Sequence, residues 1–330
     1  MIRAEHLTKE YKRYIRKEGF LSGLRSLISA EHEVKRAVDD IGFEIGEGET
    51  VGFIGPNGAG KSTTVKMLTG ILVPTSGLVE VNGIVPYKDR IANARQIGVV
   101  FGQKTQLWWD VPVIESLRLL RDIYKVPERR FKQNLELFSE LLALDEFMQT
   151  PVRQLSLGQR MKADLAAALL HDPSLLFLDE PTIGVDIVAK EKLRAFIKEI
   201  NRERKVTVLL TTHDMDDIEK LCSRIMIIDR GQVIYDGSVD RIKSRFGTGR
   251  TLVVEFENPV PDFDVPNAEL VRSEGRRKWF RFNRSATSPS ALIAQLGARH
   301  PVVDLTIEEP EIEDLIGRIY RSGTAKSGVI

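Results

Sequence analysis

Short apolar runs alternate with amphipathic stretches along most of the chain. The run at residues 50–54 is apolar at successive positions and bounded by glycine, which predicts a strand buried on both faces. Comparable runs predict strands at residues 97–101, 175–178, 206–211 and 225–228. Helical patterns lie between them, chiefly at residues 61–68, 188–200 and 215–221. This alternation predicts an α/β fold, with a mainly parallel sheet covered by helices.

Two stretches interrupt the alternation. Residues 113–170 show helical periodicity without a convincing strand, which indicates a helical subdomain, at about residues 104–170, inserted into the α/β core. Residues 9–36 are rich in Lys and Arg around the apolar residues 20–24, and we interpret them as an insertion within the N-terminal strands. A solvated loop with one short helix and a segment that contacts an anionic membrane surface are the two interpretations of this insertion.

The pattern changes after about residue 246. Residues 247–249 are typical of a linker, and strand-like segments follow at 252–256, 278–282 and 302–307. A last amphipathic helix is predicted at about residues 311–320. We therefore expect two domains: residues 1–245, and a small α+β domain at residues 246–330.

Composition narrows the class of protein. The 330 residues are 42% hydrophobic and 29% charged, with a net charge of +1, so no basic surface indicates a nucleic-acid partner. No apolar run approaches the ~20 residues of a membrane span, and the polar first residues do not resemble a signal peptide. Cys222 is the one cysteine, which excludes an internal disulfide and suggests a small buried hydrophobic residue. These features predict a cytosolic protein.

A phosphate-binding loop follows the first predicted strand. The sequence there fits G-x-x-x-x-G-K-[ST] and lies between a strand and a helix, as this motif requires. Its residues are Gly55, Pro56, Asn57, Gly58, Ala59, Gly60, Lys61, Ser62 and Thr63. The glycines allow backbone amides to surround phosphates, and Lys61 would neutralise the terminal phosphates. The Ser62 hydroxyl would bind Mg²⁺.

Polar residues follow three other predicted strands, at the sheet edge where ligands bind in such folds. Asp179 suits Mg²⁺, and the adjacent Glu180 points elsewhere and suits polarisation of an attacking water. His213 would donate a hydrogen bond to a terminal phosphate. Gln103 would contact Mg²⁺ or the attacking water. We therefore predict Glu180, His213 and Gln103 as catalytic residues, and Ser62, Gln103 and Asp179 as metal ligands.

A further motif precedes a helix that ends near residue 171. Ser156 with Gln159 three positions later is a capping box, which by itself indicates a well-started helix. Ser156 and the first amides of this helix also suit a second anion site.

Together these motifs resemble the nucleotide-binding subunit of an ATP-binding-cassette (ABC) transporter. The order along residues 1–240 matches: the phosphate loop, Gln103, the signature Ser156-Leu157-Gly158-Gln159, Asp179-Glu180, Asp186 and His213. The resemblance implies a P-loop NTPase core that binds ATP and Mg²⁺. It also implies that two such subunits pair head to tail, and that residues of one subunit complete the site of the other. The residues that it adds to ATP binding are Ser156, Gly158, Gln159, Asp186 at the dimer seam, and Tyr11 stacked on adenine.

The chain departs from the common family pattern at a few positions. Leu157 replaces a glycine of the signature, and Val185 replaces a leucine. The insertion, the Trp108-Trp109-Asp110 segment after Gln103 and the C-terminal domain are similar to those of bacterial exporter-type cassettes. Trp108 and Trp109 either pack inside the protein or help to form a socket for a membrane partner. The resemblance implies a separate integral-membrane subunit and a location on the inner face of the plasma membrane.

Two other functions are compatible with these motifs. One is a soluble ABC-type ATPase that acts on ribosomes or DNA, although such proteins usually carry two cassettes, a long coiled coil or a zinc hook. The other is a degenerate cassette that only binds nucleotide, against which the presence of Glu180 and His213 argues.

Overall fold

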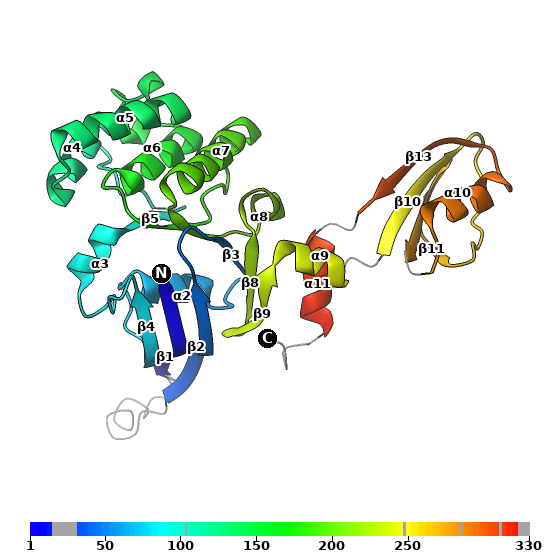
Figure 1. Cartoon of the computed structure of the whole chain (residues 1–330), viewed down its shortest axis with the longest axis horizontal. Coiled ribbons are helices and arrows are strands. Elements are labelled where there is room, and N and C mark those ends of the chain that lie inside the picture. The colour runs from blue at the N-terminus through cyan, green and yellow to red at the C-terminus, as the bar shows by residue number, and fades with distance from the viewer. Residues whose placement is uncertain (15–31, 103, 247–248, 284–285, 310–311, 323–330) are drawn as a thin grey trace, which may run out of the picture. The chain divides into compact units, whose positions relative to one another are not determined.

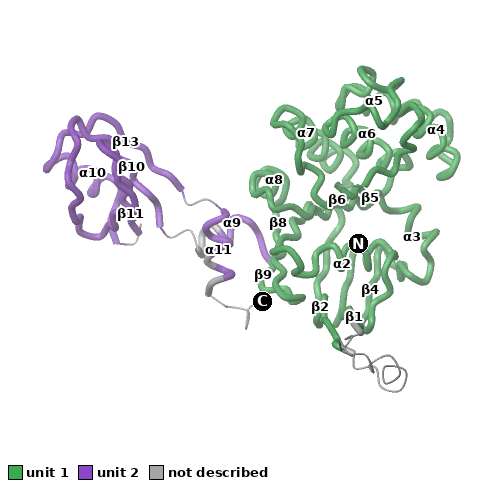
Figure 2. Tube along the Cα trace, turned by 180° about the vertical axis from the view of Figure 1, so that it is seen from behind, with its two compact units in different colours: residues 1–236, 325–330 green, residues 237–324 purple. Residues whose placement is uncertain are grey.

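The computed structural model describes residues 1–14, 32–102, 104–246, 249–283, 286–309 and 312–322. The chain divides into two compact units, Met1–Asp236 and Gly237–Thr324 (Figure 2). Each unit has a sheet and a hydrophobic core of its own, and each is described by itself.

A six-stranded sheet forms the centre of the first unit (Figure 1). Its strands, in spatial order, are β5 (Ile97–Phe101), β6 (Leu175–Asp179), β7 (Thr207–Thr211), β3 (Thr50–Ile54), β8 (Arg224–Asp229) and β9 (Gln232–Ser238). The first five are parallel, and β3 and β7 are buried along their whole length. Both faces of these strands meet protein, which explains why they appear in the sequence as continuous apolar runs. The predicted α/β core is confirmed.

This strand order brings segments distant in sequence to one edge of the sheet. Asp179, the last residue of β6, pairs with Thr211, the last residue of β7. The phosphate loop follows β3, which pairs with the other side of β7. Since the three strands are parallel, the residues after them lie at the same edge.

The helices of the first unit lie partly outside and partly inside the predicted helical region. Those outside it are α2 (Lys61–Leu68), α3 (Arg90–Gln96), α7 (Ile187–Arg204) and α8 (Met215–Leu221). The predicted helical region contains α4 (Val113–Tyr124), α5 (Glu128–Leu142) and α6 (Leu157–Leu169), with short 3₁₀ turns at Leu144–Glu146 and Val152–Gln154. None of the helices in the described part of the chain combines the length and apolar character that crossing a membrane requires.

A three-stranded antiparallel sheet lies beside α2 in the order β2-β1-β4. Its strands are β1 (Ile2–Tyr14), β2 (His32–Ile45) and β4 (Ser76–Val81). The loop interpretation of residues 9–36 is therefore wrong at both ends, since residues 9–14 and 32–36 belong to β1 and β2. Their many Lys and Arg side chains hid the strand pattern, because this end of the hairpin is largely exposed. Residues 15–31, which include the apolar residues 20–24, lie outside the described residues.

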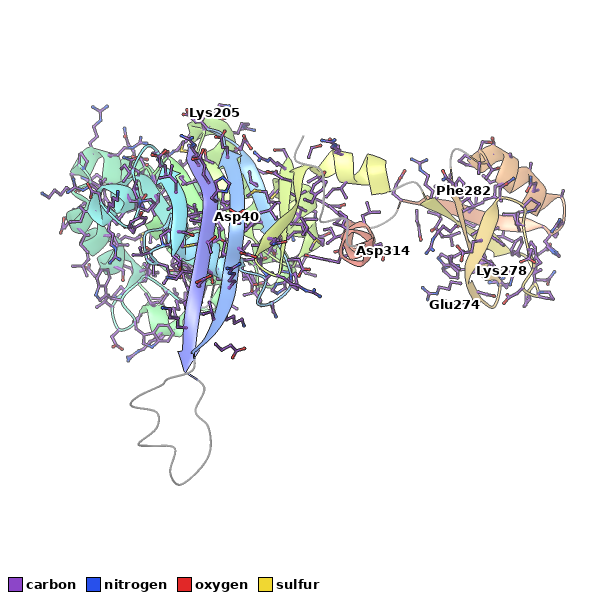
Figure 3. The ribbon with its side chains drawn as sticks, turned by 90° about the horizontal axis from the view of Figure 1, so that it is seen from below. Asp40, Lys205, Glu274, Lys278, Phe282 and Asp314 are labelled. Carbon is purple, nitrogen blue, oxygen red and sulfur yellow. The ribbon has the colours of Figure 1, made fainter. Side chains whose placement is uncertain are left out.

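The second unit is an α+β domain with a four-stranded antiparallel sheet, in the order β11-β12-β10-β13. Its elements are α9 (Val239–Phe246), β10 (Gly249–Phe256), β11 (Ala268–Glu274), β12 (Arg277–Asn283), α10 (Pro289–Gly297), β13 (Val302–Glu308) and α11 (Ile312–Ser322). Phe282 and Lys278 both lie on β12 (Figure 3). Phe282 is in the apolar core, and the buried Lys278 ammonium lies 2.6 Å from a carboxylate oxygen of Asp262. The sequence pattern did not predict β11 and α10.

Candidate functional site

The phosphate loop passes very close to other backbone segments, which explains why glycines occupy two of its positions. A Cβ on Gly55 would lie 2.2 Å from the Ile228 carbonyl oxygen, and one on Gly60 would lie 2.5 Å from the Ala37 carbonyl oxygen. Gly60 has a φ of 115°, a conformation that favours glycine. It precedes α2, whose N-terminus has no side-chain cap. The first amides of α2 are therefore oriented to bind an anion, as the motif predicts.

Lys61 is buried beneath this loop, with 7% of its surface exposed. Its ammonium group donates to the carbonyl oxygens of Gly55 at 2.5 Å and of Pro56 at 3.2 Å. Burial lowers the pKa of Lys61, and the nearby carboxylates of Glu180 and Asp179 partly oppose that shift. Among the described residues, neutral carbonyls accept the hydrogen bonds of this cation, which is therefore suited to bind an anionic phosphate.

Ser62 and Asp179 meet at the carboxyl edge of the sheet. The Ser62 hydroxyl donates to Asp179 Oδ2 at 3.4 Å, and the Thr211 hydroxyl donates to Asp179 Oδ1. A hydroxyl beside a carboxylate is an oxygen donor set that fits Mg²⁺. Gln103, the third predicted metal ligand, lies outside the described residues.

Glu180 and His213 come together although 33 positions separate them in the sequence. His213 Nδ1 lies 3.0 Å from Glu180 Oε1. Glu180 has a φ of 56°, which is uncommon for a residue with a side chain, and its amide donates to the Thr211 carbonyl oxygen at 2.9 Å. This backbone turn directs the Glu180 side chain away from that of Asp179, so that the two adjacent carboxylates face different parts of the site.

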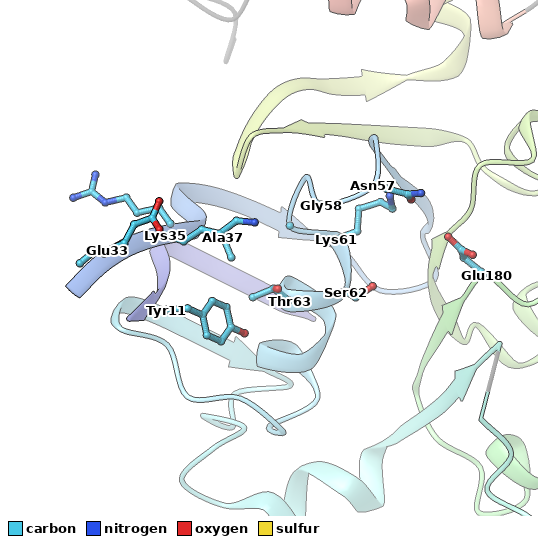
Figure 4. A pocket seen from close by; sticks show the side chains of 13 residues that line it. Tyr11, Glu33, Lys35, Ala37, Asn57, Gly58, Lys61, Ser62, Thr63 and Glu180 are labelled. Carbon is cyan, nitrogen blue, oxygen red and sulfur yellow. The ribbon is translucent and has the colours of Figure 1, made fainter. Parts of the chain in front are cut away.

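A cavity of about 980 Å³ extends along the phosphate loop. Glu180 lies at one end of it and Tyr11, from β1, at the other (Figure 4). The sequence analysis missed the contribution of β2, whose residues 33–37 line the wall beside Tyr11. Lys35 pairs with Tyr11 across the two strands, so both side chains lie on the same face of the hairpin.

The signature residues form a second cluster. Ser156 caps α6 by accepting from the Gln159 amide at 3.2 Å, and the Gln159 side chain accepts from the Ser156 amide at 3.0 Å. A Cβ on Gly158 would lie 3.5 Å from Asp186 Oδ2 and 3.1 Å from the Ala189 Cβ. Asp186 in turn caps α7 by accepting from the Ala189 amide at 2.9 Å. None of these four predicted residues (Ser156, Gly158, Gln159 and Asp186) is among the described residues that line the cavity along the phosphate loop.

Comparisons with known proteins agree with this geometry. The family model described as ABC transporter matches residues 38–183. NatA, an ABC transporter ATP-binding protein of Bacillus subtilis, is 35% identical over 210 residues, which are 64% of this chain and 85% of NatA. The linearmycin resistance ATP-binding protein LnrL, also of Bacillus subtilis, is 35% identical over 299 residues, which are 87% of this chain and 96% of LnrL.

Solved structures give the same result for the fold. The dimeric structure of MJ0796, a bacterial ABC transporter cassette, superposes with a TM-score of 0.60 at 29% identity. The match covers 72% of this chain and 99% of the cassette. The chain therefore belongs to the ABC transporter family, as one of its ATP-binding proteins.

Proposed function

We propose that this protein hydrolyses ATP and thereby drives export by a separate integral-membrane subunit, from the inner face of the plasma membrane. The contact of 3.0 Å between Glu180 and His213 carries the hydrolysis part of this proposal, and the similarity to LnrL supports the export part. It places a carboxylate and an imidazole at the edge of the sheet where the phosphate loop and Asp179 also lie. A cassette with this pair is equipped to hydrolyse nucleotide and not only to bind it.

Each residue around the cavity has a chemical role in this proposal. Lys61 and the amides of the loop bind the phosphates of ATP, and Tyr11 stacks on the adenine. Ser62, Gln103 and Asp179 would hold Mg²⁺, which would neutralise charge on the phosphates.

The acid and the imidazole act on the water and on the terminal phosphate. Glu180 accepts a proton from the attacking water, and His213 donates a hydrogen bond to the terminal phosphate. The short distance between them lets one imidazole orient the carboxylate and remain near the phosphate.

The separation of the signature cluster from the cavity supports a head-to-tail dimer. Ser156, Gly158 and Gln159 start one helix, Asp186 starts the next, and none of them lines the cavity among the described residues. A second copy or a related ATPase subunit would bring these residues to the ATP bound at Lys61. MJ0796, which has the same core fold, forms a dimer.

The remaining parts of the chain fit a transporter subunit. Residues 1–245 form the ATPase domain in this proposal, with the helical subdomain at about 104–170, and residues 246–330 form an accessory domain. The relative LnrL is named for resistance to linearmycin, which is consistent with export.

The substitution Glu180→Gln tests the catalytic assignment. Because the amide cannot accept the proton, we expect ATP binding to persist while turnover falls to background, with a trapped dimer visible by size-exclusion chromatography. Glu47→Gln, in an exposed turn away from the cavity, is the matched control. Near-normal steady-state hydrolysis by Glu180→Gln would refute the assignment.

Dilution tests the dimer. If each site needs residues from two subunits, turnover per molecule falls once the protein is diluted into the monomeric range. Turnover per molecule that stays constant on such dilution contradicts the dimer model.

Trp108 and Trp109 are candidates for the contact with the membrane subunit. They are 41% and 49% exposed, and the Arg160 guanidinium lies 5.7 Å from the ring centroid of Trp109. Large exposed aromatic residues often anchor interfaces. Alanine at both positions should preserve ATP hydrolysis by the isolated protein but reduce transport in the assembled complex. The control is alanine at the exposed Val303 and Leu305, and normal transport by the tryptophan variant contradicts the assignment.

A further inference from the structure

A buried carboxylate on α8 joins two loops that the sequence analysis treated separately. Asp217 has no exposed surface. Its Oδ1 accepts from Arg194 Nε and Nη2, each at 2.6 Å. Its Oδ2 accepts from the Thr212 hydroxyl at 3.3 Å and from the Thr182 hydroxyl. One oxygen is thus used by a buried cation of α7, and the other by two loop hydroxyls.

The two threonines belong to the segments that carry the catalytic pair. Thr182 lies two residues after Glu180, and the Ile183 amide closes this turn onto the Glu180 carbonyl oxygen at 3.4 Å. Thr212 directly precedes His213, and its hydroxyl also accepts from the Asp214 amide at 2.9 Å. Both segments therefore end on the same carboxylate oxygen of α8.

We propose that Asp217, with Arg194 as its counterion, is a positioning residue for ATP hydrolysis that holds the Glu180 segment and the His213 segment at a fixed separation. It acts through Thr182 and Thr212. The inference rests on the function proposed above.

The strained backbone at Glu180 makes such an anchor necessary. A φ of 56° is costly for a residue with a side chain and persists only when surrounding contacts impose it. The contact of Glu180 with His213 spans two loops, so it depends on the relative position of their backbones. Buried hydroxyls with a shared, charge-assisted acceptor supply that constraint, because leaving any of these groups unpaired is costly. Arg194, 5% exposed, donates to this carboxylate from two nitrogens and thereby fixes its orientation.

Removal of one hydroxyl at a time tests the proposal while leaving the ion pair intact. Thr182→Val and Thr212→Val keep the shape of the side chain and lose the donor to Asp217. Thr212→Val also loses the acceptor of the Asp214 amide, so Thr182→Val is the cleaner of the two variants. We expect kcat to fall about tenfold in each, which corresponds to one hydrogen bond of ordinary net strength, with the KM and Kd for ATP unchanged. The kcat of the double variant should fall much less than the product of the two single effects. The reason is that loss of either threonine hydrogen bond already disturbs the contact between Glu180 and His213. Thr8→Val, which removes a partly buried hydroxyl that accepts from the Asp40 amide at 3.0 Å, is the control.

Paired substitutions then separate positioning from stability. Asp217→Asn alone should lower the melting temperature because Arg194 loses the fully buried carboxylate among its partners, although Glu191 at 2.8 Å and Asp214 at 3.5 Å remain. Adding Arg194→Met removes this undercompensated buried cation, and the asparagine oxygen still accepts from both threonines. This double variant should therefore recover the melting temperature and kcat. Asp217→Leu with Arg194→Met should recover only part of the melting temperature, because two buried hydroxyls lose their acceptor, and should keep a low kcat.

Failure of this inference is distinguishable from failure of the proposed function. Wild-type kcat in both threonine variants, or a fall no larger than that of Thr8→Val, overturns the positioning role. A fall in kcat that follows a matching loss of ATP binding overturns it as well. If the proposed function is wrong, Glu180→Gln retains turnover. If only the positioning role is wrong, Glu180→Gln is inactive while Thr182→Val and Thr212→Val hydrolyse ATP normally.

Discussion

Replacing Asp164 with asparagine should stabilise the folded protein above pH 6 and leave its stability almost unchanged below pH 4. Asp164 lies on α6 and is 4% exposed. Its Oδ1 accepts from the Thr105 hydroxyl at 2.8 Å and from the Gln106 amide at 3.1 Å. The amide oxygen of an asparagine can accept the same two hydrogen bonds. The substitution therefore removes a buried charge and keeps the contacts between α6 and residues 105–106.

The magnitude follows from the pKa of this carboxyl. Burial raises the pKa of Asp164 from 3.8 to about 6, against the opposing effects of Thr105, Gln106 and Arg160. The folded state thus binds the proton more tightly than the unfolded state, so stability falls as the pH rises from about 4 to about 6. Each whole step in pKa corresponds to about 1.4 kcal/mol, which gives at most about 3 kcal/mol for the ionised carboxylate. The wild type bears this cost at neutral pH, whereas the Asp164→Asn variant has no charge to bury and avoids it.

Urea unfolding at several pH values measures the difference directly. The fluorescence of Trp108 and Trp109 reports on the unit that contains Asp164, although Trp279 in the other unit adds a signal that Trp279→Phe removes. The free energy of unfolding of Asp164→Asn minus that of wild type should grow between pH 4 and pH 6 and then stay constant. Asp122→Asn, at an exposed position of α4, controls for the chemical change. A difference that does not change with pH, or a less stable variant at pH 8, refutes the reasoning.

Lys61→Ala should weaken binding of Mg²⁺–ATP at least tenfold in a nucleotide titration, because a charge-assisted hydrogen bond contributes about 1.5–3 kcal/mol; an unchanged Kd would contradict the role of Lys61. Gly60→Ala should lower the melting temperature and abolish nucleotide binding, since its Cβ would lie 2.5 Å from the Ala37 carbonyl oxygen. Gly83→Ala also has a positive φ, but with open space around the new Cβ, and should cost only about 1 kcal/mol, so equal effects would argue against the steric explanation. Phe177→Ala, at a fully buried position of β6, should reduce the free energy of unfolding by about 3–5 kcal/mol in urea. A cost below about 1 kcal/mol would show that the surrounding core moves in to fill the space left by the Phe177 ring.

Elements with strong local signals were predictable from the sequence almost to the residue. The strand at residues 50–54 and the helix at 61–68 have the predicted bounds in the structure. The strand is a short, mostly apolar run that ends before Gly55, and the helix lies between Gly60 and Gly70, so local signals suffice. β11 was missed because its residues, Ala268–Glu274, are mostly exposed and three of the seven are charged. β1 and β2 were predicted too short for the same reason, since the outer part of their hairpin is held by pairing with each other and not by an apolar pattern.

The candidate site was predictable in its chemistry but not in its geometry. The phosphate loop is one continuous segment, so its residues and their order are visible in the sequence. Tyr11 and Lys35 are neighbours only because β1 and β2 pair in one register, and a single-residue slip would place them on opposite faces. The roles assigned to the signature residues stay predictions, because a single chain keeps Ser156 away from the cavity that contains Lys61.

The amino-acid sequence by itself determined the class of fold, the phosphate loop and the kinds of side chain available for ATP chemistry, because each depends on periodicity or on residues close together in the chain. Tertiary structure alone decided that Glu180 reaches His213, that Thr211 holds Asp179, and that Asp217 joins two loops. These contacts depend on which strands become neighbours in the sheet and in which register. The strand order and register depend on the free energy of packing the whole core, so they cannot be predicted from any one local segment.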